Sequence, residues 1–243
     1  MRIKNLNFAY GDKKIFQDLN MHLPPNGVTC IMGGSGAGKT TLLNCISRQL
    51  GFDGDIEYDN DGASFAYVFQ QPRLIPSMSV EDNIKFVLPK DTSKEQIQAR
   101  VDNIINALQL EECRKSYPSK ISGGQAGRAS LARALVTDCD VLLLDEPFKG
   151  LDVKLKNEIL NLLIPLIKQN SVVFVTHDVE EALAIADRVF VFERKDNQCV
   201  KVKGQIDVMQ CCKEITCKDE ADRDMYGERL NQIRKEIYGL LTQ

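Results

Sequence analysis

A glycine-rich segment that ends in lysine and threonine is the part of the sequence whose residue types and spacing point most directly to chemistry. Glycines let backbone N–H groups turn into one concavity, and the positive end of a following helix adds to this anion site. Lys39 is placed to reach terminal phosphates, and the hydroxyl of Thr40 is placed to ligate a bridging Mg²⁺. The alternative is a glycine-rich β-turn with a solvated lysine. The flanking apolar runs 28–32 and 42–46 disfavour this alternative, because they predict a strand before the loop and a helix after it. The predicted phosphate-binding loop consists of Gly33, Gly34, Ser35, Gly36, Ala37, Gly38, Lys39, Thr40 and Thr41.

Two acidic residues and a histidine end two further apolar runs. Asp145 and Glu146 end a run that begins at Val141, and His177 ends the next such run. Ligands of open α/β sheets lie outside the carboxyl ends of the strands, so these side chains are expected beside the phosphate-binding loop. There Asp145 would hold Mg²⁺ through its waters, and Glu146 would orient the attacking water or accept its proton. The alternative for the two acids is a helix cap followed by Pro147.

Three weaker signals accompany these residues. Gln70, just past an expected strand end, can offer its carbonyl oxygen to Mg²⁺ or to a water. Tyr10, at the end of the first expected strand, can stack on a purine, although a tyrosine at a hairpin edge has the same pattern. A serine followed by two glycines opens a further helix, which is either a second phosphate-binding N-terminus or an ordinary capped helix. The residues of this helix start are Ser122, Gly123, Gly124 and Gln125.

The order of the expected elements is that of an α/β protein. Residues 79–138 change to a helical pattern with capped starts at Ser79 and Ser93, which predicts a mostly helical insert. The tail, 205–243, has apolar residues among many charges, as in an amphipathic helix that docks on a core. The patterns predict strands over 3–10, 15–23, 28–32, 54–58, 63–69, 141–146 and 172–177, and helices over 39–50 and 153–169.

Composition limits the classes of protein that fit. The 243 residues, 43% of them hydrophobic, suffice for one sizeable core with a small appended lobe, and the net charge of −3 disfavours nucleic acid as a partner. Five of the eight cysteines are scattered as reduced thiols usually are, and Cys211, Cys212 and Cys217 lack a zinc spacing and are expected to be unligated. The polar N-terminus and the absence of a long apolar run predict a soluble intracellular chain whose membrane role would come through a partner.

The ordered set of motifs resembles the ATP-binding cassette (ABC) ATPases over roughly residues 1–204. The matching segments are Gly33 to Thr41 for the Walker A loop, Gln70 for the Q-loop, Ile121 to Gln125 for the signature motif, Val141 to Glu146 for Walker B, Gly150 to Asp152 for the D-loop, His177 for the switch histidine and Tyr10 for the aromatic A-loop. Residues 67–76 and 145–148 are similar to the ATP-binding subunits of nitrate, sulfonate and taurine importers. The chain departs from the family pattern at Ile121, at Ala126 and Gly127, and at Lys149, where a small residue usually precedes the D-loop.

The resemblance implies a fold and a domain organisation. The fold would be α/β, a P-loop NTPase with a mixed, largely parallel core sheet, an N-terminal antiparallel β subdomain and a helical insert. The whole chain, 1–243, would form one ABC ATPase domain. Its parts would be a nucleotide-binding core of 1–78 and 139–204, a helical subdomain of 79–138 with the signature motif, and a helical tail of 205–243.

The resemblance also implies an activity and its cofactors, ATP and Mg²⁺. Glu146 and His177 would be the catalytic residues, His177 acting as a sensor of the γ-phosphate, and Thr40, Gln70 and Asp145 would surround the metal. Each ATP would lie between the Walker A loop of one subunit and the signature residues of a second copy or a similar ATPase subunit. The expected protein is therefore an ATPase that works as a dimer.

Closure of that dimer would drive transmembrane permease subunits, with a substrate-binding protein involved indirectly. The chain would then be cytoplasmic and peripheral on the inner face of the membrane, and the solute would be small and anionic, such as nitrate, sulfonate or taurine. The segment 73–78, held extended by Pro72 and Pro76, would offer Leu74, Ile75 and Met78 to the permease, or its apolar residues would pack on the helical insert. The alternatives in function are a non-transport ABC ATPase of translation or DNA repair, and a P-loop small-molecule kinase.

Overall fold

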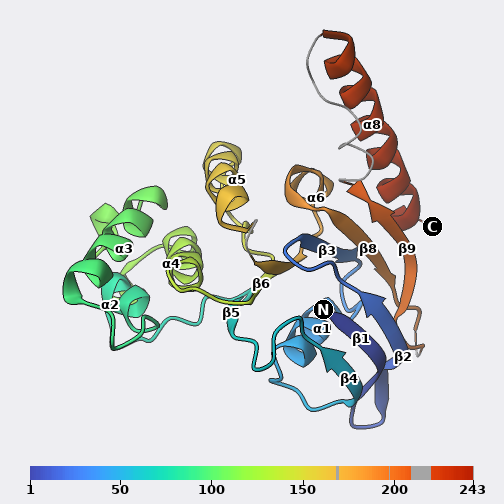
Figure 1. Cartoon of the computed structure of the whole chain (residues 1–243), viewed down its shortest axis with the longest axis horizontal. Helices are drawn as coiled ribbons and strands as arrows, with labels where there is room; N and C mark the ends of the chain where they lie inside the picture. Colours follow the sequence, from blue (N-terminus) through green and yellow to red (C-terminus); the bar gives the residue numbers. More distant parts are fainter. Residues whose placement is uncertain (168–169, 197, 209–219, 243) are drawn as a thin grey trace.

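The computed structural model describes residues 1–167, 170–196, 198–208 and 220–242, which contain a six-stranded sheet (Figure 1). The strand order is β5-β6-β7-β3-β8-β9, and all neighbours are parallel except β8 and β9, which are antiparallel. The strands are β3 (Val28–Gly33), β5 (Phe65–Val68), β6 (Val141–Asp145), β7 (Ser171–Val175), β8 (Arg188–Glu193) and β9 (Lys201–Asp207). The prediction of a mixed, largely parallel sheet is confirmed.

A second sheet is antiparallel and has three strands in the order β2-β1-β4. Its strands are β1 (Arg2–Tyr10), β2 (Lys13–His22) and β4 (Asp53–Glu57), so the predicted N-terminal hairpin is confirmed. The predicted strand 63–69 is shorter in the structure. It begins after Ser64, because the backbone N–H and hydroxyl of Ser64 donate to Asp140 Oδ2 at 2.8 and 2.7 Å.

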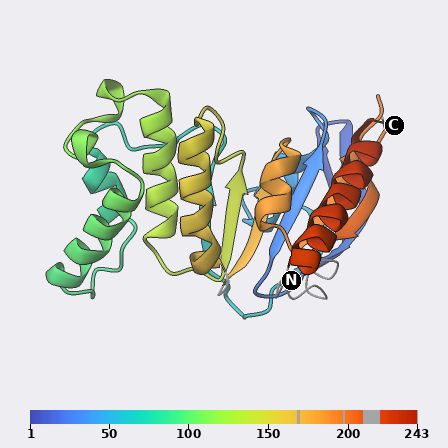
Figure 2. The same cartoon turned by 90° about the horizontal axis from the view of Figure 1, so that it is seen from above.

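Helices cover both faces of the six-stranded sheet, with α1 on one face and α5, α6 and α8 on the other (Figures 1 and 2). Their bounds are Lys39–Ile46 for α1, Val153–Ile167 for α5, Val179–Ile185 for α6 and Glu220–Thr242 for α8. The sequence predicted that the first helix reaches residue 50. It ends at Ile46 because Arg48 has a φ of 58°, which lies outside the helical region.

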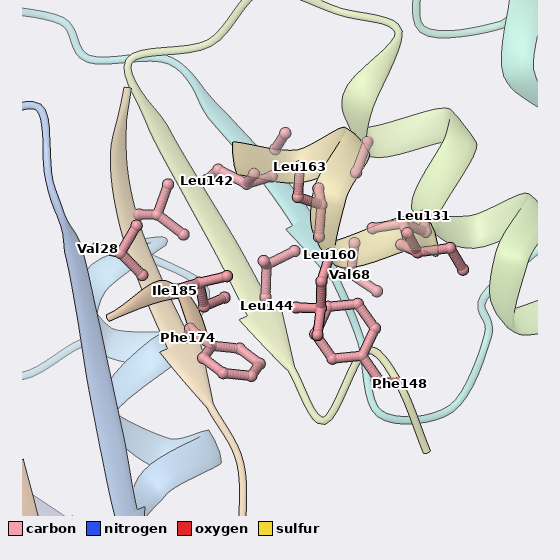
Figure 3. Packing of buried hydrophobic residues seen from close by; sticks show 14 of the residues in the cluster. Val28, Val68, Leu131, Leu142, Leu144, Phe148, Leu160, Leu163, Phe174 and Ile185 are labelled. Atoms are coloured by element: carbon pink, nitrogen blue, oxygen red, sulfur yellow. The ribbon is translucent and has the colours of Figure 1, made fainter. Parts of the chain in front are cut away.

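Alternate residues of the central strands pack into two hydrophobic clusters on opposite faces of the sheet. In β3, Cys30 and Met32 belong to one cluster and Ile31 to the other. Figure 3 shows part of the first cluster, where the ring centroids of Phe148 and Phe174 lie 5.8 Å apart. Burial on both faces is the reason that these strands read as continuous apolar runs in the sequence.

The residues between β5 and β6 form the predicted helical insert, which lies beyond the β5 edge of the sheet (Figure 1). Ser79 and Ser93 each accept a hydrogen bond from the backbone N–H three residues later, so the predicted helix starts are confirmed. The insert contains α2 (Val80–Lys85), α3 (Lys94–Ala107), α4 (Gly123–Leu135) and the short 3₁₀ turns Glu111–Cys113 and Pro118–Lys120. The division of the chain into domains remains a prediction.

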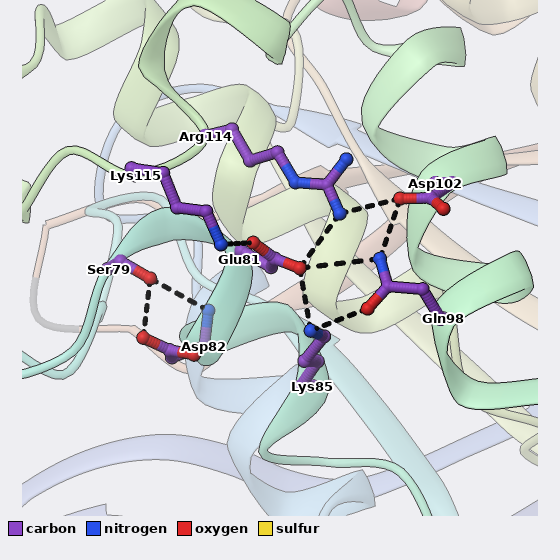
Figure 4. A network of polar contacts seen from close by, with 8 residues as sticks. All are labelled: Ser79, Glu81, Asp82, Lys85, Gln98, Asp102, Arg114 and Lys115. Carbon is purple, nitrogen blue, oxygen red and sulfur yellow. Dashed lines mark hydrogen bonds and ion pairs between the residues drawn. The ribbon is translucent and has the colours of Figure 1, made fainter. Parts of the chain in front are cut away.

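A buried carboxylate connects the parts of this insert (Figure 4). Glu81 of α2 is 2% exposed and forms ion pairs with Lys85 at 2.6 Å, with Arg114 at 2.8 Å and with Lys115. Gln98 of α3 donates to the same carboxylate at 3.4 Å. The hydrogen bond from Arg114, with those from Lys115, Lys85 and Gln98, holds the pKa of Glu81 well below its usual range although burial opposes this. The ionised carboxylate therefore stabilises the packing of α2 on α3 and on residues 114–115.

Glu81→Gln is expected to lower the free energy of unfolding at pH 7 by about 2–3 kcal/mol, because Lys85, Arg114 and Lys115 each lose the Glu81 carboxylate. The loss is limited because these cations remain partly solvated and Arg114 keeps its ion pair with Asp102 at 2.6 Å. The stabilisation by Glu81 is present above the pKa of about 4.3 that a glutamate has in the unfolded chain, and it is lost as the pH falls towards the lower folded-state pKa. Urea unfolding at pH 7 and at pH 3 measures both effects. The difference between wild type and variant should be smaller at pH 3.

Glu112→Gln, which changes an exposed carboxylate of the same insert, is the matched control and should change stability by less than about 0.5 kcal/mol. An equal loss in the two variants would contradict the role of the Glu81 network.

The C-terminal helix α8 packs on β9 and α6, as predicted for an amphipathic tail helix. Ile233 and Ile237 are buried, and a Cβ added at Gly204 of β9 would lie 2.5 Å from Leu240 Cδ1. Arg234 donates to both carboxylate oxygens of Glu180 at 2.6 and 2.8 Å. The predicted cluster Cys211, Cys212 and Cys217 lies outside the described residues.

The segment 73–78 is less available than the sequence suggested. Leu74 is half-buried and packs against the core cluster, so the expectation of an exposed apolar side chain at this position is wrong. The buried Asn83 fixes the segment, since its Oδ1 accepts from the backbone N–H of Ile75 at 2.7 Å and its Nδ2 donates to the carbonyl oxygens of Ile75 and Met78 at 3.1 Å each. The exposed residues of the segment are Arg73, Pro76 and Ser77.

Candidate nucleotide-binding site

A cavity of about 610 Å³ lies beyond the carboxyl ends of β3, β6 and β7. It brings together all nine residues of the phosphate-binding loop with Tyr10, Gln70, Asp145, Glu146 and His177. The cavity is also lined by four residues that were not expected to contact a ligand, namely Lys13, Ile15, Lys149 and Arg194. The parallel strand order therefore gathers at one edge the side chains that the sequence placed at separate strand ends.

Two glycines of the phosphate-binding loop leave no room for a side chain. Gly33 has a φ of 146°, and a Cβ there would lie 2.4 Å from the carbonyl oxygen of Phe192. Gly38 has a φ of 80°, and a Cβ there would lie 2.8 Å from Val200 Cγ2. These close contacts hold the loop against β8 and the segment before β9, so its curvature is set by packing as well as by the glycines.

Lys39 begins α1 and folds over the loop that precedes it. Its ammonium group donates to the carbonyl oxygens of Gly33 and Gly34 at 2.8 and 2.9 Å. Burial lowers the pKa of Lys39, while the charges of Glu146 and Asp145 oppose that shift. The ammonium group is thus held at the cavity by carbonyl oxygens and carboxylates, where an anionic phosphate chain can take over these contacts.

Thr40 and Asp145 form the part of the cavity best suited to a divalent cation. Thr40 Oγ1 donates to Asp145 Oδ2 at 2.7 Å, and Asp145 is 2% exposed. Burial raises the pKa of Asp145, and the charge of Glu146 adds to this shift. The hydrogen bond from Thr40 and the charge of Lys39 oppose it. A bound cation would favour the ionised form, and a carboxylate with a hydroxyl beside a phosphate-binding loop is a donor set that fits Mg²⁺.

Glu146 is surrounded by polar groups from two other segments and from its own. Its carboxylate accepts from Gln70 Nε2 at 3.0 Å, pairs with Lys149 Nζ at 3.2 Å, and lies 3.5 Å from His177 Nδ1. Burial raises the pKa of Glu146, but the hydrogen bonds from Lys149 and Gln70 and the charges nearby outweigh it, so the pKa lies below the ordinary value. The side chain is therefore a carboxylate at neutral pH, able to accept a hydrogen bond from water.

The backbone of Glu146 also has an unusual conformation. Its φ is 48°, which is rare for a residue with a side chain, and its N–H donates to the carbonyl oxygen of Val175 at 2.9 Å. This hydrogen bond joins the residue after β6 to the last residue of β7. Glu146 and His177 are consequently fixed to the same pair of strand ends.

The lining of the cavity also includes an aromatic ring and two cations, Lys13 and Arg194. Tyr10 is 49% exposed, and its ring stands edge-on to that of Phe8 with centroids 4.8 Å apart. Arg194 donates to the carbonyl oxygens of Lys14 and Gln198, at 2.9 Å each, which fixes its guanidinium group between β2 and the residues after β8. No sequence pattern marked Lys13 or Arg194, whereas Lys149 was visible as a departure from the family pattern.

The signature residues do not join this cavity. Ser122 accepts from the backbone N–H of Gln125 at 3.2 Å, and Gln125 Oε1 accepts from the N–H of Ser122 at 2.9 Å, which forms a capping box at the start of α4. Gly123 and Gly124 line a separate cavity of about 310 Å³ that also contacts Gln70 and Glu146. Their predicted contact with nucleotide requires a second subunit and remains a prediction.

A phosphate-binding loop between β3 and α1, with acids at the end of a parallel strand in the same sheet, defines the chain as a P-loop NTPase by fold. The profile of the ABC transporter family matches residues 16–149, more than half of the chain. The chain belongs to this family.

Relatives and one solved structure agree with this assignment. The chain is 38% identical to the sulfate/thiosulfate import ATP-binding protein of Neisseria meningitidis serogroup B over 205 residues, which cover 78% of this chain and 57% of that protein. It is 34% identical to an aliphatic sulfonates import ATP-binding protein of Paracoccus denitrificans, covering 78% and 77%, and 34% identical to an Fe(3+) ions import ATP-binding protein of Fusobacterium nucleatum, covering 86% and 59%. The chain thus spans little more than half the length of the Neisseria protein.

The solved structure is a dimeric post-hydrolysis state of the ATP-binding cassette MJ0796 bound to ADP and Pi. It superposes with a TM-score of 0.74 at 27% identity, covering 85% of this chain and 98% of that chain. In the part of the chain that the structure describes, no helix is both long enough and apolar enough to cross a membrane.

Proposed function

We propose that the protein is an ATP-hydrolysing subunit of an ABC transporter. The observation that carries this proposal is the convergence, on one cavity, of the phosphate-binding loop, the Thr40–Asp145 pair and the cluster of Gln70, Glu146 and His177. The family assignment and the likeness to a cassette with bound ADP and Pi support it.

In this proposal each side chain has a separate task. Backbone N–H groups of the loop and Lys39 bind the phosphates, and Tyr10 stacks on the base. Thr40 and Asp145 would hold Mg²⁺, and the side-chain carbonyl oxygen of Gln70 would be available to it because Nε2 of Gln70 donates to Glu146. The metal, when bound, would stabilise charge on the phosphates. Glu146 then accepts a proton from the attacking water, while His177 lies beside it to contact the terminal phosphate.

The proposed active form is a dimer in which the signature residues of one copy complete the site of the other. The separation of Gly123 and Gly124 from the phosphate-binding loop in a single chain supports this arrangement, as does the dimeric state of the related cassette. ATP would draw the two copies together and hydrolysis would release them. A second copy or a similar ATPase subunit is therefore the first partner.

The proposed second partner is a permease, which would hold this chain at the cytoplasmic face of the membrane. The exposed residues Arg73, Pro76 and Ser77, on a segment fixed by Asn83, are offered as part of that contact. We propose import of a small oxyanion such as a sulfonate, because two of the three relatives named above are import proteins for sulfate/thiosulfate and for aliphatic sulfonates. Nitrate and taurine remain proposals of the same class. A substrate-binding protein would then act indirectly.

Release of phosphate from ATP without any acceptor molecule tests the proposed activity. The purified chain with ATP and Mg²⁺ is expected to release phosphate. EDTA is expected to reduce the release to background because it removes the Mg²⁺ that the Thr40–Asp145 pair would hold. Restoring Mg²⁺ should restore the rate. Phosphate transfer only after addition of an acceptor would contradict hydrolysis and favour the small-molecule kinase, and release that is unaffected by EDTA would contradict the metal site.

A further inference from the structure

The loop that carries His177 is held by a group of polar side chains outside the cavity. Lys156 of α5 donates from Nζ to Asp178 Oδ2 at 2.7 Å and to Glu181 Oε1 at 3.0 Å. Thr176 Oγ1 donates to Glu181 Oε2 at 2.5 Å and accepts from the N–H of Asp178 at 3.0 Å. The residues on both sides of His177 are therefore fixed by the same set of contacts.

These contacts are more shielded from water than those of His177 itself, although the side chain of Asp178 is 31% exposed. Thr176 is 1% exposed and Glu181 is 7% exposed, and both carboxylate oxygens of Glu181 have a partner. The side chain of His177 is 68% exposed, with Glu146 3.5 Å away. A long contact on an exposed ring constrains its position weakly, so the contacts of the neighbouring residues are the stronger constraint on this loop.

Lys156 also belongs to the segment that follows Glu146. Asp152 caps the first turn of α5, since its Oδ1 accepts from the N–H of Leu155 at 3.0 Å and its carbonyl oxygen accepts from the N–H of Lys156 at 2.9 Å. The first turn of α5 and the loop after β7 are thus joined through one ammonium group. The two segments carry Glu146 and His177 to the same side of the cavity.

We propose that Lys156 is a positioning residue, which fixes the loop of His177 to the first turn of α5 and so holds the imidazole beside Glu146. Lys156 does not line the cavity and acts through Asp178 and Glu181. The kinetic consequence of this inference rests on the proposed ATPase function. The placement of His177 by Lys156 does not rest on that function, and it can be measured separately.

Lys156→Met removes the charge and keeps most of the side chain, and Lys154→Met, at an exposed position of the same helix, is the matched control. Lys156→Met is expected to lower kcat about tenfold while KM and the dissociation constant for ATP change by less than about twofold, as for residues that orient a catalytic group. Lys154→Met should match wild type. Lys156→Arg should recover most of kcat, because it retains a donor for both carboxylates.

A double-mutant cycle with His177→Ala separates positioning from a general structural role. If Lys156 acts through His177, adding Lys156→Met to His177→Ala should cause no further loss of kcat. A structural role predicts instead a further loss of about tenfold in the double variant, with a fall in Tm. That second outcome would overturn the proposal.

Histidine ring signals in NMR provide a measurement that does not depend on activity, because the chain contains only His22 and His177. The signal of His177, assigned by its loss in His177→Ala, should shift or broaden in Lys156→Met and stay unchanged in Lys154→Met, with His22 constant throughout. If wild type releases no phosphate, the proposed function has failed and this measurement still decides the inference. An unchanged His177 signal in folded Lys156→Met overturns it.

Asp178→Asn replaces Lys156→Met if that variant does not fold. Asp178 Oδ1 accepts a hydrogen bond from the N–H of Glu180 at 2.9 Å, and the asparagine oxygen can keep this bond. The substitution removes the negative charge that faces Lys156. The expected kinetic and NMR effects are the same in direction. A wild-type kcat with an unchanged His177 signal in Asp178→Asn would contradict the proposal.

Discussion

Glu146→Gln is expected to lower kcat for ATP hydrolysis by about 100- to 10,000-fold, the range over which a positioned general base contributes. The amide keeps the shape of the side chain but cannot accept a proton from water at neutral pH. Gln70 and Lys149 contact the carboxylate, and the amide oxygen can still accept from them. The dissociation constant for ATP should therefore change little, and phosphate release measured under single-turnover conditions reports the loss directly.

Because Glu146→Gln blocks hydrolysis, ATP should hold this variant as a dimer. Size-exclusion chromatography with light scattering measures the dimer. Glu236→Gln, at an exposed position of α8, is the control and should behave as wild type in both assays. Phosphate release at the wild-type rate by folded Glu146→Gln would show that Glu146 is not the base.

Lys39→Ala is expected to raise the dissociation constant for ATP about 10- to 100-fold, because one charge-assisted hydrogen bond contributes about 1.5–3 kcal/mol. The ammonium group donates to the carbonyl oxygens of Gly33 and Gly34, so its loss also removes two contacts that shape the loop. Isothermal titration calorimetry with ATP and with ADP measures the effect. A larger loss for ATP than for ADP is expected, since the side chain is aimed at the terminal phosphates.

Lys154→Ala provides the control for removal of a lysine from an exposed helix position, and should bind ATP as wild type does. Circular dichroism of Lys39→Ala must show an intact fold. Unchanged ATP affinity in the folded variant would contradict the assignment of residues 33–41 as the phosphate-binding loop.

Features that depend on neighbouring residues were predictable from the sequence. The glycine spacing and Lys39 define a loop whose conformation depends on a few consecutive residues, and the structure contains that loop between β3 and α1. The helix starts at Ser79 and Ser93 were predictable for the same reason, because a cap bonds an N–H only three residues away. The end of α1 was not, since nothing in the sequence marks the left-handed conformation of Arg48.

Features that depend on which distant segments meet could not be predicted in detail. Arg194 lines the cavity because β8 pairs with β3 and its side chain reaches the carbonyl oxygen of Lys14. Leu74 was expected to be exposed, and the packing of the helical insert half-buries it. Arg114, which forms an ion pair with Glu81, lies more than thirty positions further along the chain.

The sequence by itself determined the phosphate-binding loop, the family and most of the elements, because local backbone preferences and the burial of alternate side chains are encoded in short segments. It did not predict α6, β8 or β9. Tertiary structure decided how the site is assembled. The order β6-β7-β3 places the N–H of Glu146 on the carbonyl oxygen of Val175, and the packing of α5 against α6 places Lys156 on Asp178 and Glu181. These contacts join segments far apart in the chain, and such pairings follow from crossover connections and packing, which no short stretch of sequence specifies.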